Sequence, residues 1–262
     1  MPPSARIPGR LDTATILLRS VYATLRISVP TIYEVYRGTY RRSYGDARLR
    51  WWSRRLLELI ELDCKVVGAE HFALAPGKPT ILMSNHQSLY DIPLIFVALP
   101  GSIRMLTKKE LFRVPIWGRG MKAGEFVAID RHDRNQAFRD LAEARRKMED
   151  DIVLWVAPEG TRSRDGRLGS FKKGGFMLAL ETGARIIPIG IHGADAVLPA
   201  GTWNVRLGCT AEVRLGEPIE ASDYTVARRD ELMAEVAKQI CALAGIHPRE
   251  SATDAANGVA AA

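Results

Sequence analysis

The chain has few cysteines, and their spacing limits what they can do. The three of them, Cys64, Cys209 and Cys241, lie far apart and form no CxxC pair. An odd number at this spacing argues against a disulfide framework and a zinc knuckle, and it fits a reducing compartment. Of the 262 residues, 47% are hydrophobic and 26% are charged, which predicts an ordinary globular core and excludes disorder over most of the length.

Long apolar runs are also missing. A membrane-spanning helix needs about 20 consecutive apolar residues. Arg19 and Arg26 interrupt the candidate Leu11–Tyr33, and Ile92–Ile103 is too short. The run Ala14–Leu18 is short for the core of a signal peptide and precedes no convincing cleavage site. We therefore expect neither a transmembrane span nor export.

Positive charge is concentrated at the start of the chain. Residues 1–56 contain eleven arginines and three acids, a balance of +8, whereas the whole chain carries +7. This region up to residue 52 also contains five of the seven tyrosines and two of the five tryptophans. Arginine combined with interfacial aromatics is typical of helices that lie in a bilayer interface. An anionic membrane surface is thus the expected partner, and a nucleic acid is not, because no recognition motif accompanies the charge. The alternative is a helical pair packed on the domain with a solvated arginine face.

Composition and hydrophobic pattern divide the chain into three parts. Residues 1–60 form a basic, amphipathic helical region, in which Pro30 is expected to break or kink the first helix. Residues 61–250 form the main domain, where short apolar runs alternate with helical stretches. Residues 251–262 are mostly small, with six alanines, and are expected to form a disordered tail.

The main domain is predicted to be α/β, with a mixed, largely parallel sheet flanked by helices, because strands and helices alternate. The expected strands are Cys64–Val67, Thr80–Ser84, Arg104–Leu106, Phe126–Ile129, Ile152–Val156, Arg185–Ile191 and Ala211–Leu215. The expected helices are Ala47–Ile60, Ile92–Ala98, Ile116–Met121, Arg134–Glu149, Gly175–Glu181 and Val226–Ala244.

The segment Asn85–Asp91 contains a candidate catalytic pair. His86 follows the strand Thr80–Ser84, and Asp91 falls near the first turn of the next helix. Across such a strand-to-helix turn the two side chains can meet, so that the aspartate holds one imidazole nitrogen and leaves the other as a general base. The spacing alone is a weak signal, because a helix-capping aspartate beside a surface histidine would also produce it.

Two further polar segments follow predicted strands. Lys108–Gly118 begins with two lysines that can meet an anion at a strand end. Pro158–Ser163 follows the strand Ile152–Val156 and contains Arg162, whose guanidinium can form a fork with a phosphate, and Thr161, which can add a donor. Read alone, Lys108–Gly118 is better explained as a solvated basic turn, and Pro158–Ser163 is about equally compatible with a polar turn and with a site. The apolar strand Ile186–Ile189 reads as core.

Taken together, these four segments resemble the glycerolipid acyltransferase family, and in particular its 1-acylglycerol-3-phosphate O-acyltransferases. The family pattern is NHxxxxD, KxELxxxPxxG, FPEGTRS and a V-I-P strand, which correspond here to Asn85–Asp91, Lys108–Gly118, Pro158–Ser163 and Ile187–Ile189. The resemblance covers about residues 64–215.

The resemblance implies a role for each matching residue. His86 would deprotonate the sn-2 hydroxyl of a lysophospholipid, and Asp91 would orient His86 and balance its charge. Lys108, Arg162 and the neighbouring Thr161 would bind the phosphate of the acceptor. Glu159 and Gly160, which directly precede Thr161, would complete the site. Glu159 would shape the acceptor site, and Gly160 would let the backbone approach closely.

The expected reaction transfers a fatty acyl group from acyl-coenzyme A or acyl carrier protein to 1-acylglycerol-3-phosphate and gives phosphatidic acid for phospholipid synthesis. No metal and no cofactor are expected. Another lysolipid, such as lyso-ornithine lipid, is an alternative acceptor, and a non-catalytic lipid-binding protein is an alternative function. The expected location is the cytoplasmic face of the cell membrane, with the protein peripheral or monotopic.

Overall fold

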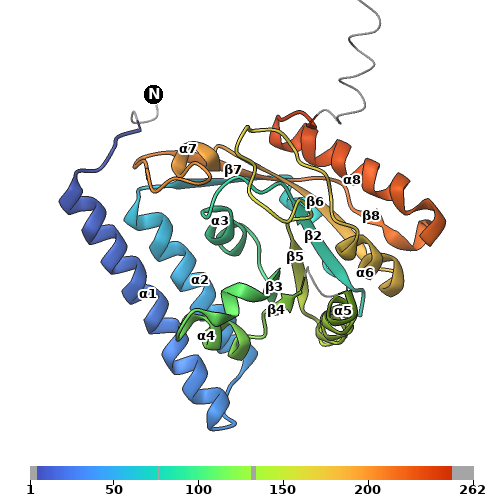
Figure 1. Ribbon diagram of the computed structural model, residues 1–262, viewed down its shortest axis with the longest axis horizontal. Coiled ribbons are helices and arrows are strands. Elements are labelled where there is room, and N and C mark those ends of the chain that lie inside the picture. Colours follow the sequence, from blue (N-terminus) through green and yellow to red (C-terminus); the bar gives the residue numbers. More distant parts are fainter. Residues whose placement is uncertain (1–4, 76, 131–133, 250–262) are drawn as a thin grey trace, which may run out of the picture.

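A single eight-stranded sheet organises the computed structural model, which describes residues 5–75, 77–130 and 134–249 (Figure 1). The strands are β1 (Asp63–Val67), β2 (Thr80–Ser84), β3 (Ile103–Lys108), β4 (Val127–Ile129), β5 (Val153–Val156), β6 (Arg185–His192), β7 (Thr210–Leu215) and β8 (Ile219–Glu220). The α-helices are α1 (Arg10–Tyr36), α2 (Arg42–Leu59), α3 (Asp91–Ala98), α4 (Trp117–Ala123), α5 (Arg134–Glu149), α6 (Gly174–Thr182), α7 (Ala194–Val197) and α8 (Arg229–Ala244). The described 3₁₀ turns are η1 (Ala69–His71), η2 (Lys109–Arg113), η3 (Ala221–Asp223) and η4 (Val226–Arg228).

The strand order is β1-β7-β6-β2-β5-β3-β4, with β8 beside β6. The pairs β1–β7, β6–β2, β2–β5, β5–β3 and β3–β4 are parallel, and β7 and β8 are antiparallel to β6. The predicted mixed, largely parallel α/β sheet is therefore confirmed. Parallel strands of this kind are joined by helices that cover both faces, which is why their sequences read as continuous apolar runs.

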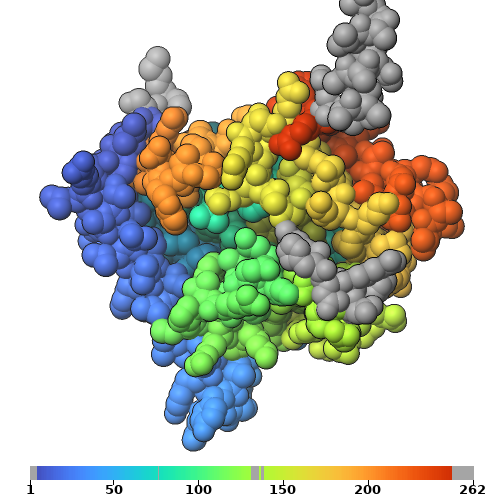
Figure 2. All heavy atoms as spheres, viewed as in Figure 1, coloured from blue at the N-terminus to red at the C-terminus, as the bar shows by residue number. Residues whose placement is uncertain are grey.

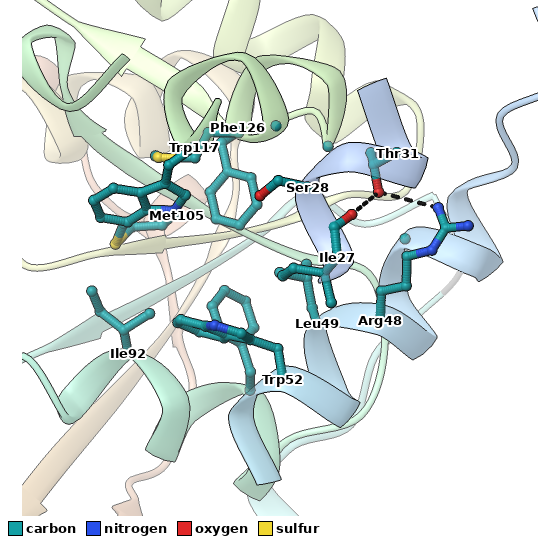
Figure 3. A pocket seen from close by; sticks show the side chains of 15 residues that line it. Ile27, Ser28, Thr31, Arg48, Leu49, Trp52, Ile92, Met105, Trp117 and Phe126 are labelled. Carbon is teal, nitrogen blue, oxygen red and sulfur yellow. Dashed lines mark hydrogen bonds between the residues drawn. The ribbon is translucent and has the colours of Figure 1, made fainter. Parts of the chain in front are cut away.

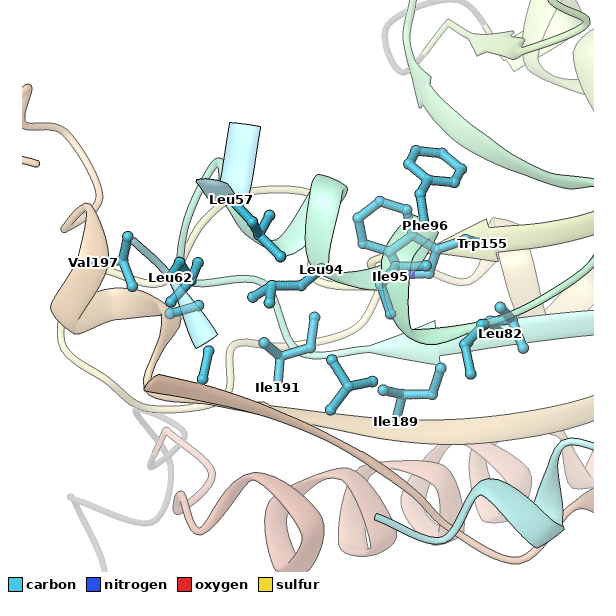
Figure 4. Close-up of a cluster of buried hydrophobic side chains, with 14 of the residues drawn as sticks. Leu57, Leu62, Leu82, Leu94, Ile95, Phe96, Trp155, Ile189, Ile191 and Val197 are labelled. Carbon is cyan, nitrogen blue, oxygen red and sulfur yellow. The ribbon is translucent and has the colours of Figure 1, made fainter. Parts of the chain in front are cut away.

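The core lies on both faces of the sheet. Side chains of β2 alternate between them: Leu82 points toward α3, whereas Ile81 and Met83 point toward the opposite layer. Figure 4 shows the first layer, in which Leu94 and Phe96 of α3 pack with aliphatic side chains of the central strands. The second layer packs α5, α6 and α8 against the other face. Each fully buried large apolar side chain contributes about 1.5–3 kcal/mol to folding.

The N-terminal helices α1 and α2 run side by side, with α4 also packed on α1 (Figure 1). An ion pair between Arg48 and Glu34 joins the two helices, and the Trp52 indole N–H donates to Thr24 Oγ1 at 3.1 Å. Pro30 was expected to break or kink the first helix. The break is wrong, because α1 continues through Pro30 to Tyr36. Buried side chains on either side of the proline, packed against α2 and α4, hold the helix together despite the missing backbone hydrogen bond.

Other element boundaries also differ from the sequence prediction. Helix α2 begins at Arg42, five residues before the predicted start at Ala47. The two-residue strand Ile219–Glu220 was not predicted, because so short an edge strand has no periodicity. The predicted tail 251–262 lies outside the described residues. Within the described part of the chain, no helix offers a stretch long and apolar enough to cross a bilayer.

Candidate functional site

The three polar segments singled out from the sequence lie at one edge of the sheet. Strands β2, β5 and β3 are neighbours and run parallel, so their carboxyl ends meet there. His86 follows β2, the loop from Ala157 to Ser163 follows β5, and Lys108 is the last residue of β3. Sites in open α/β sheets form at this edge.

His86 and Asp91 form the predicted pair. The imidazole Nδ1 of His86 lies 2.7 Å from Oδ2 of Asp91, which begins α3. The same carboxylate oxygen accepts the backbone N–H groups of Gln87 at 2.8 Å and Ser88 at 3.0 Å. The side chain of Asp91 is completely buried, whereas the side chain of His86 is 20% exposed. The carboxylate therefore fixes the proton on Nδ1, and Nε2, which has no hydrogen bond to any described residue, carries the lone pair.

The loop after β5 holds the backbone of the histidine. The N–H of His86 donates to Oε1 of Glu159 at 2.9 Å, and its carbonyl accepts the N–H of Ser163 at 2.7 Å. The second oxygen of Glu159 accepts the N–H of Gly169 at 2.7 Å. Burial raises the pKa of Glu159, and the hydrogen bonds from Gly169 and His86 oppose that rise. Glu159 is thus a buried clamp on His86.

Asn85 supports the pair from the other side, a role that the sequence did not reveal. Its side-chain amide donates to the carbonyl of Ile191 at 2.8 Å, and its Oδ1 accepts the N–H of Ile191 at 2.7 Å. This completely buried asparagine thereby ties the end of β2 to β6. The hydroxyl of Ser88 donates to the carbonyl of Leu198 at 2.9 Å. Only the position of Asn85 directly before His86 could have suggested its role.

The predicted anion-binding residues stand at the rim. Lys108 is exposed and Arg162 is half-buried, and neither has an ion pair with a described residue. Lys109, in contrast, forms an ion pair with Asp130. Thr161 is exposed beside Gly160, whose φ of +76° is a left-handed conformation that glycine adopts without strain. His192, at the end of β6, does not join the pair, because it is exposed and its Nδ1 contacts the carbonyl of Ala244 in α8.

An apolar pocket lies between the N-terminal helices and the sheet. Ile92, which directly follows Asp91, forms part of its wall, and Figure 3 shows Trp52, Met105, Trp117 and Phe126 around the same space. Helices α1 and α2 supply the opposite wall. The pocket thus connects the start of α3 with the predicted N-terminal region.

No group of three or more His, Cys, Asp or Glu side chains in the described ranges is arranged to hold a metal ion. Burial raises the pKa of Cys64 to about 11, with the nearby charge of Asp63 contributing, and burial also raises the pKa values of Cys209 and Cys241. All three thiols are therefore poor nucleophiles at neutral pH.

Comparison with known proteins decides the family. The sequence model described as Acyltransferase matches residues 63–192. The 1-acyl-sn-glycerol-3-phosphate acyltransferase of Saccharomyces cerevisiae is 30% identical over 232 residues, which cover 85% of this chain and 75% of the yeast protein. The chain belongs to the acyltransferase family.

Further members of the acyltransferase family are similar to this chain in sequence or in structure. The chloroplastic 1-acyl-sn-glycerol-3-phosphate acyltransferase LPAT1 of Arabidopsis thaliana is 34% identical over 188 residues, 71% of this chain and 52% of the relative. The chain therefore spans about half the length of the chloroplast relatives that it matches. The crystal structure of the 1-acyl-sn-glycerophosphate acyltransferase PlsC from Thermotoga maritima has a TM-score of 0.67 at 25% identity and covers 92% of this chain and 99% of that chain. The matched acyltransferase region contains the pair His86–Asp91 and the segments after β3 and β5.

Proposed function

We propose that this protein transfers a fatty acyl group to the sn-2 hydroxyl of 1-acylglycerol-3-phosphate and so forms phosphatidic acid for phospholipid synthesis. The observation that carries the proposal is the state of His86. Its Nδ1 is fixed by the buried Asp91, and its Nε2 has no partner among the described residues at the edge where three strands end. A histidine held in this way is a general base for a hydroxyl group.

The proposed reaction proceeds by direct transfer. Nε2 of His86 accepts the proton of the acceptor hydroxyl while the hydroxyl oxygen attacks the thioester carbonyl. The tetrahedral oxyanion then collapses, the carbon–sulfur bond breaks, and the leaving thiolate takes the proton from His86. Asp91 stabilises the imidazolium that exists between these two proton transfers. The raised pKa values of the three cysteines argue against an acyl-enzyme on sulfur.

The acceptor phosphate is proposed to bind Lys108 and Arg162. Both cations lack an ion pair within the described chain. Arg162 lies in the loop after β5, which is adjacent to β2, and Lys108 ends β3, on the other side of β5. Lys109 is a natural control, because Asp130 already pairs with it. Changing Lys108 to methionine should therefore raise the KM for lysophosphatidic acid, whereas the same change at Lys109 should leave this KM close to that of the wild type.

The apolar pocket between α1, α2, α3 and α4 is proposed to hold an acyl chain. Its lining is mostly aromatic and aliphatic, and Ile92 joins it to the catalytic segment (Figure 3). A mostly apolar lining suits a hydrocarbon chain, and Ser28, Thr31 and Arg48 are the polar members of this lining. The donor would be acyl-coenzyme A or acyl carrier protein, and we propose that the transfer requires no cofactor.

The protein is proposed to work at an anionic membrane surface, on the cytoplasmic face of the cell membrane and without spanning it. Helix α1, dark blue in Figure 2, lies along one edge of the molecule. Leu11, Leu18, Tyr22 and Val29 on this helix are between 52% and 85% exposed. They recur at helical spacing and form one apolar stripe, which a bilayer interface would cover.

The test is an acyl-transfer assay of the purified protein with both thioester donors against a panel of lysolipids. Wild type should acylate lysophosphatidic acid faster than lyso-ornithine lipid or other lysolipids, and His86→Ala should lose the activity while remaining folded. A faster rate with lyso-ornithine lipid would favour the alternative acceptor. Binding of lysolipid without turnover in wild type would instead favour a non-catalytic lipid-binding protein.

A further inference from the structure

A second, basic groove lies between α1 and α2, away from the strand-end site. Helix α1 contributes Arg19, Tyr22 and Arg26 to this α1–α2 groove, and helix α2 contributes Trp51, Arg55 and Glu58. Its lining therefore contains three guanidinium groups and one carboxylate. None of these residues belongs to the catalytic pair, to the proposed phosphate-binding rim or to the apolar pocket.

Two of the arginines have charge to offer a ligand. Arg55 is 3.1 Å from Glu58, so the single carboxylate of the groove is already paired. Arg19 and Arg26 form no ion pair with any residue in the described ranges. The groove consequently has an excess of two positive charges, which suits one anionic group.

Arg26 is held in position before any ligand arrives. Its Cζ lies 4.6 Å from the centre of the Trp51 ring, a stacking contact that leaves the N–H groups at the guanidinium edge free to donate. Arg19 lies two helical turns, or about 10 Å, along α1 on the same side. Two long side chains at this separation can both reach a group between them, and the fork of donors on each matches phosphate oxygens.

The surroundings of the groove indicate where the phosphate comes from. Tyr22 lines the groove and also belongs to the apolar stripe of α1, in which Leu18 is 70% exposed. A helix in a bilayer interface places its apolar stripe among the acyl chains and its flanking arginines at the level of the lipid phosphates. Arg19 and Arg26 of the α1–α2 groove flank the apolar stripe and would lie at this level.

We propose that the α1–α2 groove binds the phosphate of an anionic phospholipid, with Arg19 and Arg26 as its ligands and Trp51 holding Arg26. This inference deepens the proposed function, on which its membrane placement rests, and it adds a lipid site distinct from the one for the acceptor. The bound lipid is a structural partner from the membrane, and it fixes the rotation of α1 about its axis.

The full-length protein can be titrated with dihexanoyl phosphatidylglycerol below the concentration at which this lipid forms micelles. The reporter is the part of the tryptophan emission change that Trp51→Phe removes. We expect a saturable response in the wild type and a Kd at least about tenfold weaker in Arg19→Gln/Arg26→Gln. Arg10→Gln/Arg37→Gln removes the same charge from the ends of the same helix and should bind with the Kd of the wild type.

Several outcomes would overturn the proposal. An unchanged Kd in Arg19→Gln/Arg26→Gln, or an equal loss in the control double variant, would leave only general electrostatic attraction. Inorganic phosphate that binds as tightly as the lipid would indicate a site for a free anion. Dihexanoyl phosphatidylcholine that binds equally well would show that net charge is not recognised.

Acyl transfer in detergent micelles separates this proposal from the proposed function. Arg19→Gln/Arg26→Gln should keep the rate of the wild type there, because the change lies outside the catalytic segments. Loss of lipid binding with acyl transfer intact is the expected pattern for this variant. If the wild type binds the lipid through the groove but transfers no acyl group, the proposed function fails and the groove remains.

Discussion

The sharpest prediction concerns the carboxylate behind His86. In Asp91→Asn, the side-chain oxygen can still accept the bonds from His86, Gln87 and Ser88, but the negative charge that balances the imidazolium is gone. The same change in the histidine–aspartate pair of serine proteases costs about 10⁴-fold in kcat, because the neutral amide no longer holds the imidazole in the reactive tautomer. We expect a loss of this order here, or about 5 kcal/mol of transition-state stabilisation.

The structure also predicts the cost to stability. Oδ1 of Asp91 is buried and has no hydrogen-bond partner in the described part of the chain. In Asp91→Asn the new NH₂ group occupies this position without an acceptor, which should lower the free energy of unfolding by about 1–3 kcal/mol. Urea unfolding of the variant and the wild type measures this difference in the free energy of unfolding, and it also establishes that the variant is folded under assay conditions.

A double-mutant cycle tests whether Asp91 acts through His86. The rate is that of thiol release from acyl-coenzyme A in the presence of lysophosphatidic acid. If the aspartate works only by orienting and balancing the imidazole, Asp91→Asn should cost little further once His86 is alanine, because groups that act as one unit are not additive. Additive losses in the double variant, or a single Asp91→Asn variant within tenfold of wild type, would refute the reasoning.

Neutralising Lys108 or Arg162 should raise the KM for lysophosphatidic acid more than it lowers kcat, and an effect on kcat alone in steady-state kinetics would argue against phosphate binding. Cys64, with a pKa of about 11, should be only about 10⁻⁴ thiolate at pH 7, so iodoacetamide should label it slowly in the folded protein, as mass spectrometry can follow. Burial alone would raise the pKa of Glu125, but hydrogen bonds and charge from Arg42 outweigh burial and lower it. This contribution to stability is present above the unfolded pKa of about 4.3 and is lost as the pH falls through the folded value, so Glu125→Gln should destabilise by about 1–3 kcal/mol at pH 7 and by less in acid, measured by urea unfolding. A destabilisation independent of pH would contradict it.

Much of the site was predictable because its signals are local. The apolar run Thr80–Ser84 ends just before His86, and Asp91 falls at the start of a helix, so the contact between the two follows from one short segment. The strand end at Val156 was likewise readable from a short apolar run, whereas β3 extends to Lys108, two residues past its predicted end at Leu106. The resemblance to the acyltransferase family joined these local signals into one site.

What the sequence could not supply were contacts between distant segments. Nothing in the local pattern says that β5 inserts between β2 and β3, which is what brings Arg162 beside the histidine segment. The capture of the His86 N–H by Glu159 crosses 73 positions, and the pairing of Asn85 with Ile191 crosses 106. At Pro30 the local signal was the wrong guide to the end of the helix. The tendency of proline to end a helix is overridden by the packing of α1 against α2 and α4.

The clamp of Glu159 on the backbone of His86 has a consequence for how activity appears during refolding. The histidine segment lies at the end of β2, but its backbone is secured only when β5 has docked beside that strand and the following loop has closed. Helical signal from α1, α2 and α8 can return earlier, because it needs only short-range contacts. During refolding, the enzymatic rate should therefore recover later than the helical circular dichroism signal. The return of turnover then reports the late docking of β5 and its following loop.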